Sequence, residues 1–334
     1  MRCAALPCVL ALVLTWIAAA KGKGGRTDCA RQSYRKNVLK LVKVQRDQAH
    51  QSRAPSSPRR PPAGRRSPPP PLRPPQEAPF AGLFRDVKNH TKFEASGVAA
   101  VRGHFYAVFD NSFALGRLDE RFSFRGPDNA LVGEMRGESQ YEGIAYVPEK
   151  DTFLLLQEAA PAGRRGASTF RPAVVEVRLR ADGAGYDQLA RCDVDFELSH
   201  GNKGFESIAY LHTASGEAFL LGLCEGNFCR GGRDGADAGN GRIIVTRLRQ
   251  GGEGGCAWEP VKSLHIPPGA HFRDYAAMAF NFAAGKLAIL SQEDAAIWVS
   301  LRSLSLDAQR SLSLNAPRRG VACLGPRWRR MGAL

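Results

Sequence analysis

The sequence predicts an all-β fold, a β-propeller in which four blades of four strands are visible. The phrase aromatic–Glu–small–Ile–Ala–Tyr occurs at residues 141–146 and again at 205–210, each time followed by a turn, an apolar run and a second glutamate. Such internal repetition is typical of propeller blades. The region 81–309 shows no strong helical periodicity, which argues against an α-solenoid or an α/β enzyme. A β-sandwich is the alternative fold.

Each copy of the phrase predicts the first two strands of a blade. Two weaker copies occur at residues 94–111 and 274–294, and the four copies are spaced 46 to 70 residues apart. A third strand is predicted after every copy, and a fourth strand after the two middle copies. The predicted third strands are 113–118, 173–179, 242–248 and 296–301, and the predicted fourth strands are 190–198 and 257–266. Four antiparallel strands per repeat are the composition of a propeller blade.

The number of blades stays open. The residues after Asp307 contain no further copy of the phrase, although propellers with five or six blades are common. We therefore expect either that blades are missing from this sequence or that degenerate blades close the ring.

The two ends of the chain are predicted to lie outside the propeller, which occupies residues 81–309. Residues 1–20 have a positive start, an apolar core and an Ala-x-Ala site, which are typical of a secretory signal peptide; a membrane anchor is the alternative. Residues 21–80 form a basic leader with 11 prolines in its second half, and we expect it to be disordered. Residues 310–334 are expected to be a basic, disordered tail. No later stretch reaches transmembrane length, so we expect a secreted, extracellular protein that does not span a membrane.

The net charge of +15 comes from the two ends rather than from the folded region. The leader carries 15 Lys and Arg against 3 Asp and Glu, the tail carries 6 Arg and no acid, and residues 81–309 are left with a net charge of −4. A nucleic-acid-binding domain would carry positive charge on its folded surface, so no specific nucleic-acid partner is expected. The basic leader predicts weak, salt-dependent attachment to anionic surfaces, with a simple spacer as the alternative.

The cysteines and one sequon agree with export. Six of the eight cysteines follow the predicted signal peptide, and disulfides form in an oxidising compartment. Cys224 and Cys229 are separated by a hairpin-sized segment and are the candidate disulfide pair; half of a zinc site is the alternative. Asn89 lies in the sequon Asn-His-Thr and is the candidate for glycosylation. The sequence leaves the partners of four further cysteines open: Cys29, Cys192, Cys256 and Cys323.

The repeated phrase resembles a known group of propellers. "YEGIAY" (141–146) and "KGFESIAY" (203–210) are similar to the blade-opening phrase of the phytase-like (esterase-like) and SdiA-regulated β-propeller families, as are the strand endings "LLLQEA", "LGLCEGN" and "AILSQED". The resemblance covers residues 94–300 and implies a secreted or periplasmic propeller with calcium held by acidic groups near its channel. The first and fourth copies place Ser96 and Ala276 where glutamate is expected, which excludes a symmetric ring of that glutamate.

The repeated acids are the candidate metal ligands. Because the first strand of each blade lines the channel of a propeller, the repeats place Glu142 and Glu206 around one axis. A second set of acids stands where the second strands end, and Asp274 can add to either set. These further candidates are Asp110, Glu158, Glu225, Glu293 and Asp274. Oxygen ligands from separate strands suit calcium. Alternatively, each acid accepts hydrogen bonds from the backbone of the next blade or pairs with the arginine of the repeated Arg-Leu.

Two functions agree with these features. The first is a secreted, calcium-associated propeller that hydrolyses a phosphoester or ester or binds a ligand. The sequence identifies no catalytic residue, since it contains neither a Gly-x-Ser-x-Gly elbow nor a Walker loop. The second is a non-catalytic interaction propeller whose channel acids are purely structural. The expected partner is a small molecule, a glycan or a protein.

Overall fold

The computed structural model describes most of the predicted propeller and short parts of both ends of the chain. The described residues are 38–41, 76–85, 93–161, 169–198, 201–202, 204–212, 216–225, 229, 240–250, 255–281, 286–294, 296–300 and 321–323. The predicted signal peptide, most of the leader and the sequon at Asn89 lie outside these residues. Within them, no helix combines the length and the apolar character that crossing a membrane requires.

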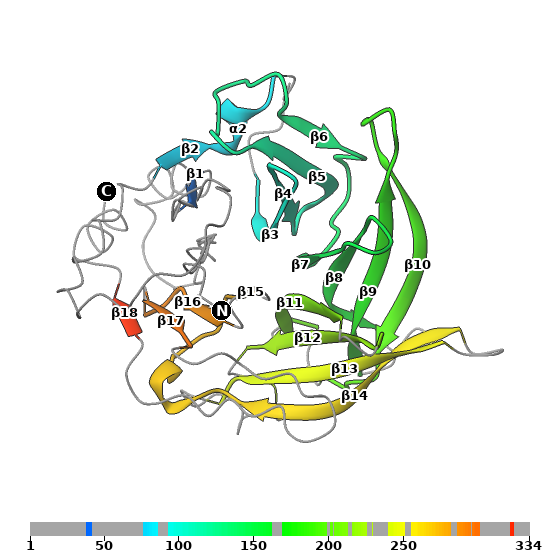
Figure 1. Ribbon diagram of the computed structural model, residues 1–334, viewed down its shortest axis with the longest axis vertical. Helices are drawn as coiled ribbons and strands as arrows, with labels where there is room; N and C mark the ends of the chain where they lie inside the picture. The colour runs from blue at the N-terminus through cyan, green and yellow to red at the C-terminus, as the bar shows by residue number, and fades with distance from the viewer. Residues whose placement is uncertain are drawn as a thin grey trace, which may run out of the picture.

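Strands β3 to β18 form four units of four antiparallel strands around a common centre (Figure 1). Unit 1 consists of β3 (Ala95–Val101), β4 (His104–Phe109), β5 (Ser112–Asp119) and β6 (Ala130–Val132). Unit 2 consists of β7 (Tyr141–Val147), β8 (Thr152–Pro161), β9 (Phe170–Leu179) and β10 (Tyr186–Val194). Unit 3 consists of β11 (Phe205–His212), β12 (Ala218–Cys224), β13 (Arg242–Gln250) and β14 (Cys256–His265), and unit 4 of β15 (Ala277–Asn281), β16 (Lys286–Ser291), β17 (Ala296–Val299) and β18 (Val321–Cys323). The all-β propeller fold predicted from the repeats is confirmed.

The middle strands are buried on both faces because the units stack side by side. The first five residues of β8 are all buried, as are those of β13. Alternate residues of a strand point to opposite faces. Leu154 and Leu156 therefore pack towards unit 3, whereas Phe153 and Leu155 pack towards unit 1. This two-sided burial explains the continuous apolar runs in the sequence, which one-sided sheets do not need.

Three hydrophobic clusters fill the spaces between neighbouring units. Each cluster combines side chains from one face of a unit with side chains from the facing side of the next. Representative pairs are Leu115 with Leu155 between units 1 and 2, Leu156 with Phe205 between units 2 and 3, and Ile243 with Trp298 between units 3 and 4. Burial of apolar surface between units, at about 25 cal/mol per Å², is the main stabilising term of this arrangement.

The start of the domain covers the other face of unit 1. The short helix α2 (Phe80–Leu83) buries Phe80 against Phe109, with ring centroids 5.3 Å apart. Phe80 is the last residue of the predicted leader, and its side chain is buried. Just before it, β2 (Gln76–Pro79) pairs with β1 (Val38–Leu41), and this small sheet lies between units 1 and 4 (Figure 1).

Short parts of both ends pair with other strands, whereas most of the predicted leader and tail lies outside the described residues. At the C-terminal end, Val321–Cys323 forms β18 and pairs with Ala296–Trp298 of β17. Open sheet edges present unpaired backbone groups, and a short segment of almost any composition can satisfy them. Such segments carry no repeat signal, which is why the sequence did not reveal them. A fifth or sixth unit is not found among the described residues.

Units 2 and 3 are joined at the rim as well as at the centre. The outer strands β10 and β14 pair in parallel, with Val194 opposite Trp258, so that the two units share one eight-stranded sheet. A disulfide between Cys192 and Cys256 crosses the same junction. The sequence left these two cysteines unpaired because the contact joins residues 64 positions apart. The predicted local disulfide, Cys224–Cys229, is also present.

The two disulfides should differ in their contribution to stability. In the chain-entropy description, a cross-link over 64 residues stabilises by about 4 kcal/mol and one over 5 residues by about 2 kcal/mol. We expect the Cys192→Ser/Cys256→Ser variant to unfold at a lower urea concentration than the Cys224→Ser/Cys229→Ser variant. Urea unfolding under non-reducing conditions measures both. Equal midpoints would show that the rim junction does not depend on its disulfide.

Candidate functional site

A β-bulge lies at the repeated acid position of the inner strands in units 1 to 3. The pairing of each inner strand with its neighbour shifts by one residue there, leaving one extra residue on the inner strand. The extra residues are Ser96, Glu142 and Glu206. A bulge bends the strand and re-aims a side chain, which is why bulges recur next to functional sites. The repeated phrase is therefore the sequence of a bulged inner strand.

A small residue follows each bulge, because neighbouring inner strands approach closely there. A Cβ atom on Gly97 would lie 2.9 Å from Gly143 Cα, and a Cβ atom on Gly143 would lie 3.0 Å from the Ile208 backbone nitrogen. In unit 3, the Ser207 hydroxyl donates a hydrogen bond to the Met278 carbonyl at 3.3 Å. The inner strands of the four units are thereby in contact from one unit to the next.

Glu142 is at the centre of the acidic group that forms beside these bulges. Its side chain is buried and is hydrogen-bonded to the side chain of Ser96 in unit 1. Burial raises the pKa of Glu142 well above its usual range, and the charges of Glu158, Asp110 and Glu225 raise it further. The fold thus brings four of the seven predicted acids close enough to interact, from three different units. Ser96, which looked like a departure from the repeat, is the partner of this glutamate.

Two members of the acidic group also hold neighbouring units together. Glu158 Oε1 accepts a buried hydrogen bond from the Gly204 backbone nitrogen, 2.7 Å away, just before β11. Asp110 acts through its backbone, because its carbonyl accepts hydrogen bonds at 2.9 Å from the nitrogens of Ser139 and Gln140. The first contact joins units 2 and 3, and the second joins units 1 and 2. The contact of Glu158 is of the kind that the sequence left as the alternative to metal binding, whereas that of Asp110 does not involve its carboxylate.

Asp274 braces a turn within its own unit. It accepts hydrogen bonds from the Ser291 hydroxyl and from the backbone nitrogens of Gln292 and Glu293, the last two at 3.0 Å. Its carboxylate is buried at the end of β16. The role of Asp274 is therefore the local support of the β16–β17 turn.

Glu293 and Glu206 complete the set of predicted acids. Glu293 is exposed, and its carboxylate lies 3.8 Å from the guanidinium of Arg273 in the same unit. Glu206 is half-buried and occupies the same bulge position in unit 3 as Glu142 does in unit 2. Among the described residues, its charge is not one of those that raise the pKa of Glu142. The charges that raise the pKa of Glu142 are those of strand-end acids.

The donors that calcium needs do not converge in this arrangement. Among the residues that the structure describes, no group of three or more His, Cys, Asp or Glu side chains is placed so that it could hold a metal ion. Calcium takes six to eight oxygen ligands, whereas Glu158 and Asp274 direct carboxylate oxygens to backbone N–H groups. The acids as arranged do not fit a calcium ion, and calcium stays a prediction from the sequence.

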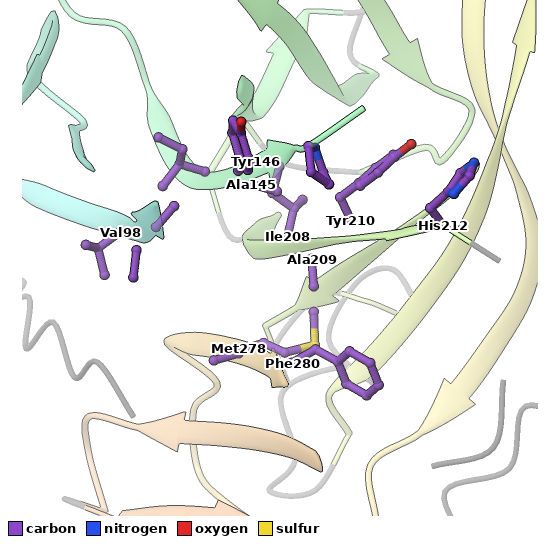
Figure 2. A pocket seen from close by; sticks show the side chains of 14 residues that line it. Val98, Ala145, Tyr146, Ile208, Ala209, Tyr210, His212, Met278 and Phe280 are labelled. Atoms are coloured by element: carbon purple, nitrogen blue, oxygen red, sulfur yellow. The ribbon is translucent and has the colours of Figure 1, made fainter. Parts of the chain in front are cut away.

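The inner strands also enclose a cavity of about 580 Å³ along the central axis (Figure 2). All four inner strands line it, each with three consecutive residues that follow the bulge region. These residues form three layers: Val98, Ile144, Ile208 and Met278; Ala99, Ala145, Ala209 and Ala279; and Ala100, Tyr146, Tyr210 and Phe280. The repeated Ile-Ala-Tyr phrase in the sequence corresponds to these lining residues in units 2 and 3. No role for the phrase was predicted from the sequence.

The aromatic layer is tied to charged residues of one turn, residues 148–151 between β7 and β8. The Tyr146 hydroxyl donates a hydrogen bond to Asp151 Oδ1 at 2.6 Å, and the Tyr210 hydroxyl donates one to Glu149 Oε1. Burial, followed by the neighbouring carboxylate, raises the pKa of both tyrosines, so both hydroxyls remain protonated donors at neutral pH. Arg102 lies over the Tyr146 ring, 5.8 Å from its centroid.

Comparisons with known proteins find similarity in structure alone. No family model matches the chain, and no curated protein matches it in sequence. One similar solved structure is the periplasmic gluconolactonase PpgL of Pseudomonas aeruginosa, at 13% identity and a TM-score of 0.35, covering 64% of this chain and 51% of that one. Others are the dihydro-heme d1 dehydrogenase NirN (12%, TM-score 0.31, 73% and 40%) and the WD40 β-propeller domain of Doa1 (12%, TM-score 0.26, 63% and 52%). The chain spans about half the length of these structures or less, and at these values the likenesses carry no conclusion about function.

The buried position of Glu142 predicts a specific dependence of stability on pH. Because its pKa is raised on folding, its contribution to stability is fully present below about pH 4.5 and is lost as the pH rises through the folded-state value. The Glu142→Gln variant cannot ionise. We expect it to melt above the parent protein at pH 8 by at least about 2–4 °C, the change that 1 kcal/mol produces in a domain of this size.

The difference in melting temperature between the Glu142→Gln variant and the parent should disappear near pH 4. Thermal unfolding of the full chain followed by circular dichroism across the pH range measures it. Glu293→Gln is the matched control, because Glu293 is exposed and should show no such difference. A constant offset between the Glu142→Gln variant and the parent at every pH would contradict the prediction.

Proposed function

We propose that the protein is a secreted β-propeller that binds a small, largely apolar ligand in its central channel. The observation that carries this proposal is the cavity of about 580 Å³ lined by all four inner strands. Small-molecule sites in proteins are typically apolar cavities of about 300–1,000 Å³ with a few polar groups. Here the ring of His212 is the polar group among the lining side chains, and Tyr146 and Tyr210 line the cavity while their hydroxyls are hydrogen-bonded to Asp151 and Glu149.

The arrangement of the acids supports binding rather than hydrolysis as the primary activity. A calcium-dependent hydrolase of the phytase-like type, which the repeat motifs resemble, would need carboxylates open to a metal and a substrate. Glu158 instead accepts a hydrogen bond from the next unit, and Asp274 accepts hydrogen bonds from a turn. Glu142 is buried beside Ser96. These contacts favour a structural role for the acids, and no catalytic step follows from them.

Export is part of the same proposal. Residues 1–20 have the pattern of a signal peptide. The disulfides Cys192–Cys256 and Cys224–Cys229 support folding in an oxidising compartment, because structural disulfides are rare where thiols are kept reduced.

Filling the channel should abolish binding without disturbing the packing between units. Ala279 lines the cavity and belongs to none of the hydrophobic clusters among the described residues, so Ala279→Leu adds bulk where the ligand would lie. We expect fluorobenzene, used as a small apolar probe, to bind the full chain and to bind this variant at least about tenfold more weakly. Fluorine-detected NMR titration measures both. Gln188→Leu, on an exposed position of β10, is the control and should bind as the parent does.

An unchanged affinity in Ala279→Leu, with circular dichroism showing a folded protein, would place the probe outside the channel. Failure of the parent protein to bind fluorobenzene at all would remove the support for an apolar ligand.

The effect of calcium on the melting temperature distinguishes the proposed ligand-binding function from a calcium-dependent hydrolytic function. If the acids hold calcium, millimolar calcium chloride should raise the melting temperature, because a ligand of the native state stabilises it by mass action. Replacing both Glu142 and Glu206 with Gln should then abolish the rise. The structure leads us to expect no rise in the parent protein, measured by thermal unfolding with and without a chelator. A rise that the double variant lacks would restore the metal site and the hydrolytic proposal.

A further inference from the structure

Three units place an aromatic side chain at the same position of the inner strand. Tyr146, Tyr210 and Phe280 form the last layer of the channel, and the equivalent residue of unit 1 is Ala100. All four line the cavity, and Figure 2 shows the three aromatic side chains on the strands around it. The small Ala100 leaves one side of the layer open. The rings also pack against the hydrophobic clusters between units, and Tyr210 is buried, so a ligand in the channel would contact the part of each ring that lines the cavity.

Carboxylates polarise the two tyrosine rings. Each hydroxyl donates a hydrogen bond to a carboxylate, Tyr146 to Asp151 and Tyr210 to Glu149. A hydrogen bond to a charged carboxylate shifts electron density towards the donor oxygen and its ring, and the bond of Tyr210 is the one that is partly buried. An electron-rich ring attracts a cation to its face. The Glu149 carboxylate also places negative charge beside the Tyr210 ring, which would repel an anionic ligand.

The molecule itself contains a cation at one of these rings. The Arg102 guanidinium lies 5.8 Å from the centroid of Tyr146 and pairs with Asp151 at 3.2 Å. Nearby, Lys150 pairs with Glu176 at 3.2 Å.

These two ion pairs do not include Glu149, and Arg178 is a further cation near Asp151. Among the described residues, Glu149 has no ion-pair partner, and its contact is the hydroxyl of Tyr210. His212 is the other titratable side chain that lines the cavity.

We propose that the channel binds an organic cation with apolar substituents, such as an alkylammonium group, and that Tyr210 and Phe280 are its main aromatic contacts. The proposal rests on the ligand-binding function of the channel and adds the charge of the ligand. The apolar layers below accept the substituents, the rings face the cationic centre, and Glu149 supplies the balancing charge through Tyr210. Aromatic side chains backed by a carboxylate are the chemistry that recognises quaternary ammonium compounds.

The test compares choline with its neutral isostere 3,3-dimethyl-1-butanol, which has the same shape without the charge. Isothermal titration calorimetry on the full chain at pH 8 measures both affinities. We expect choline to bind about tenfold more tightly than the isostere. Tyr210→Leu should remove this preference. Glu149→Gln, which retains a hydrogen-bond acceptor for Tyr210 but removes the charge, should reduce the preference at least about threefold.

The outcomes separate the two proposals. If the isostere binds as tightly as choline, the cationic ligand is overturned while the binding channel stands. If neither compound binds and fluorobenzene also fails, the channel function itself is overturned. A preference for choline that Tyr210→Leu retains, in a variant shown by circular dichroism to be folded, would place the cation elsewhere and overturn the assignment of the site.

Discussion

The close approach of the inner strands is the constraint on which the rest of this structure depends. Gly97 and Gly143 have no side chain because the backbone of the next unit occupies the space that a Cβ atom would take. Ser207 is the largest residue at this position in units 1 to 3, and it uses its hydroxyl to hold Met278. Only when the strands lie this close can the bulged residues of different units interact and the following residues enclose a narrow channel.

The two ends of each inner strand have different chemistry. The bulge at the start places Glu142 among other acids, where burial favours its protonated form. Four residues later, about 13 Å along an extended strand, Tyr146 belongs to the aromatic layer of the channel. At the first end, Glu158 accepts a hydrogen bond from the next unit. At the second end, the tyrosine hydroxyls donate hydrogen bonds to carboxylates of the turn between β7 and β8. The acidic group and the aromatic group that we propose as a ligand site therefore lie at opposite ends of one strand.

Much of the fold could be predicted from the sequence because its units repeat. Strands buried on both faces have continuous apolar runs, such as that of β8, and the bulge, the small residue and the Ile-Ala-Tyr phrase recur together. The gathering of Asp110, Glu158 and Glu225 around Glu142 also follows from the repeat, since equivalent positions of a propeller meet near its axis. The same repetition did not distinguish a metal site from a set of contacts between units, because both require an acid at each strand end.

The sequence by itself determined the all-β repeat, the local Cys224–Cys229 disulfide and the separation of charge between the ends and the folded region. Each of these is encoded within a short stretch or by recurrence. Only the tertiary structure decided the Cys192–Cys256 bridge, the use of Val321–Cys323 as an outer strand and the aromatic end of the channel. These features depend on which distant residues meet when the units close around the axis. The amino-acid sequence contains no local pattern that predicts such contacts, because they are determined by packing geometry rather than by composition.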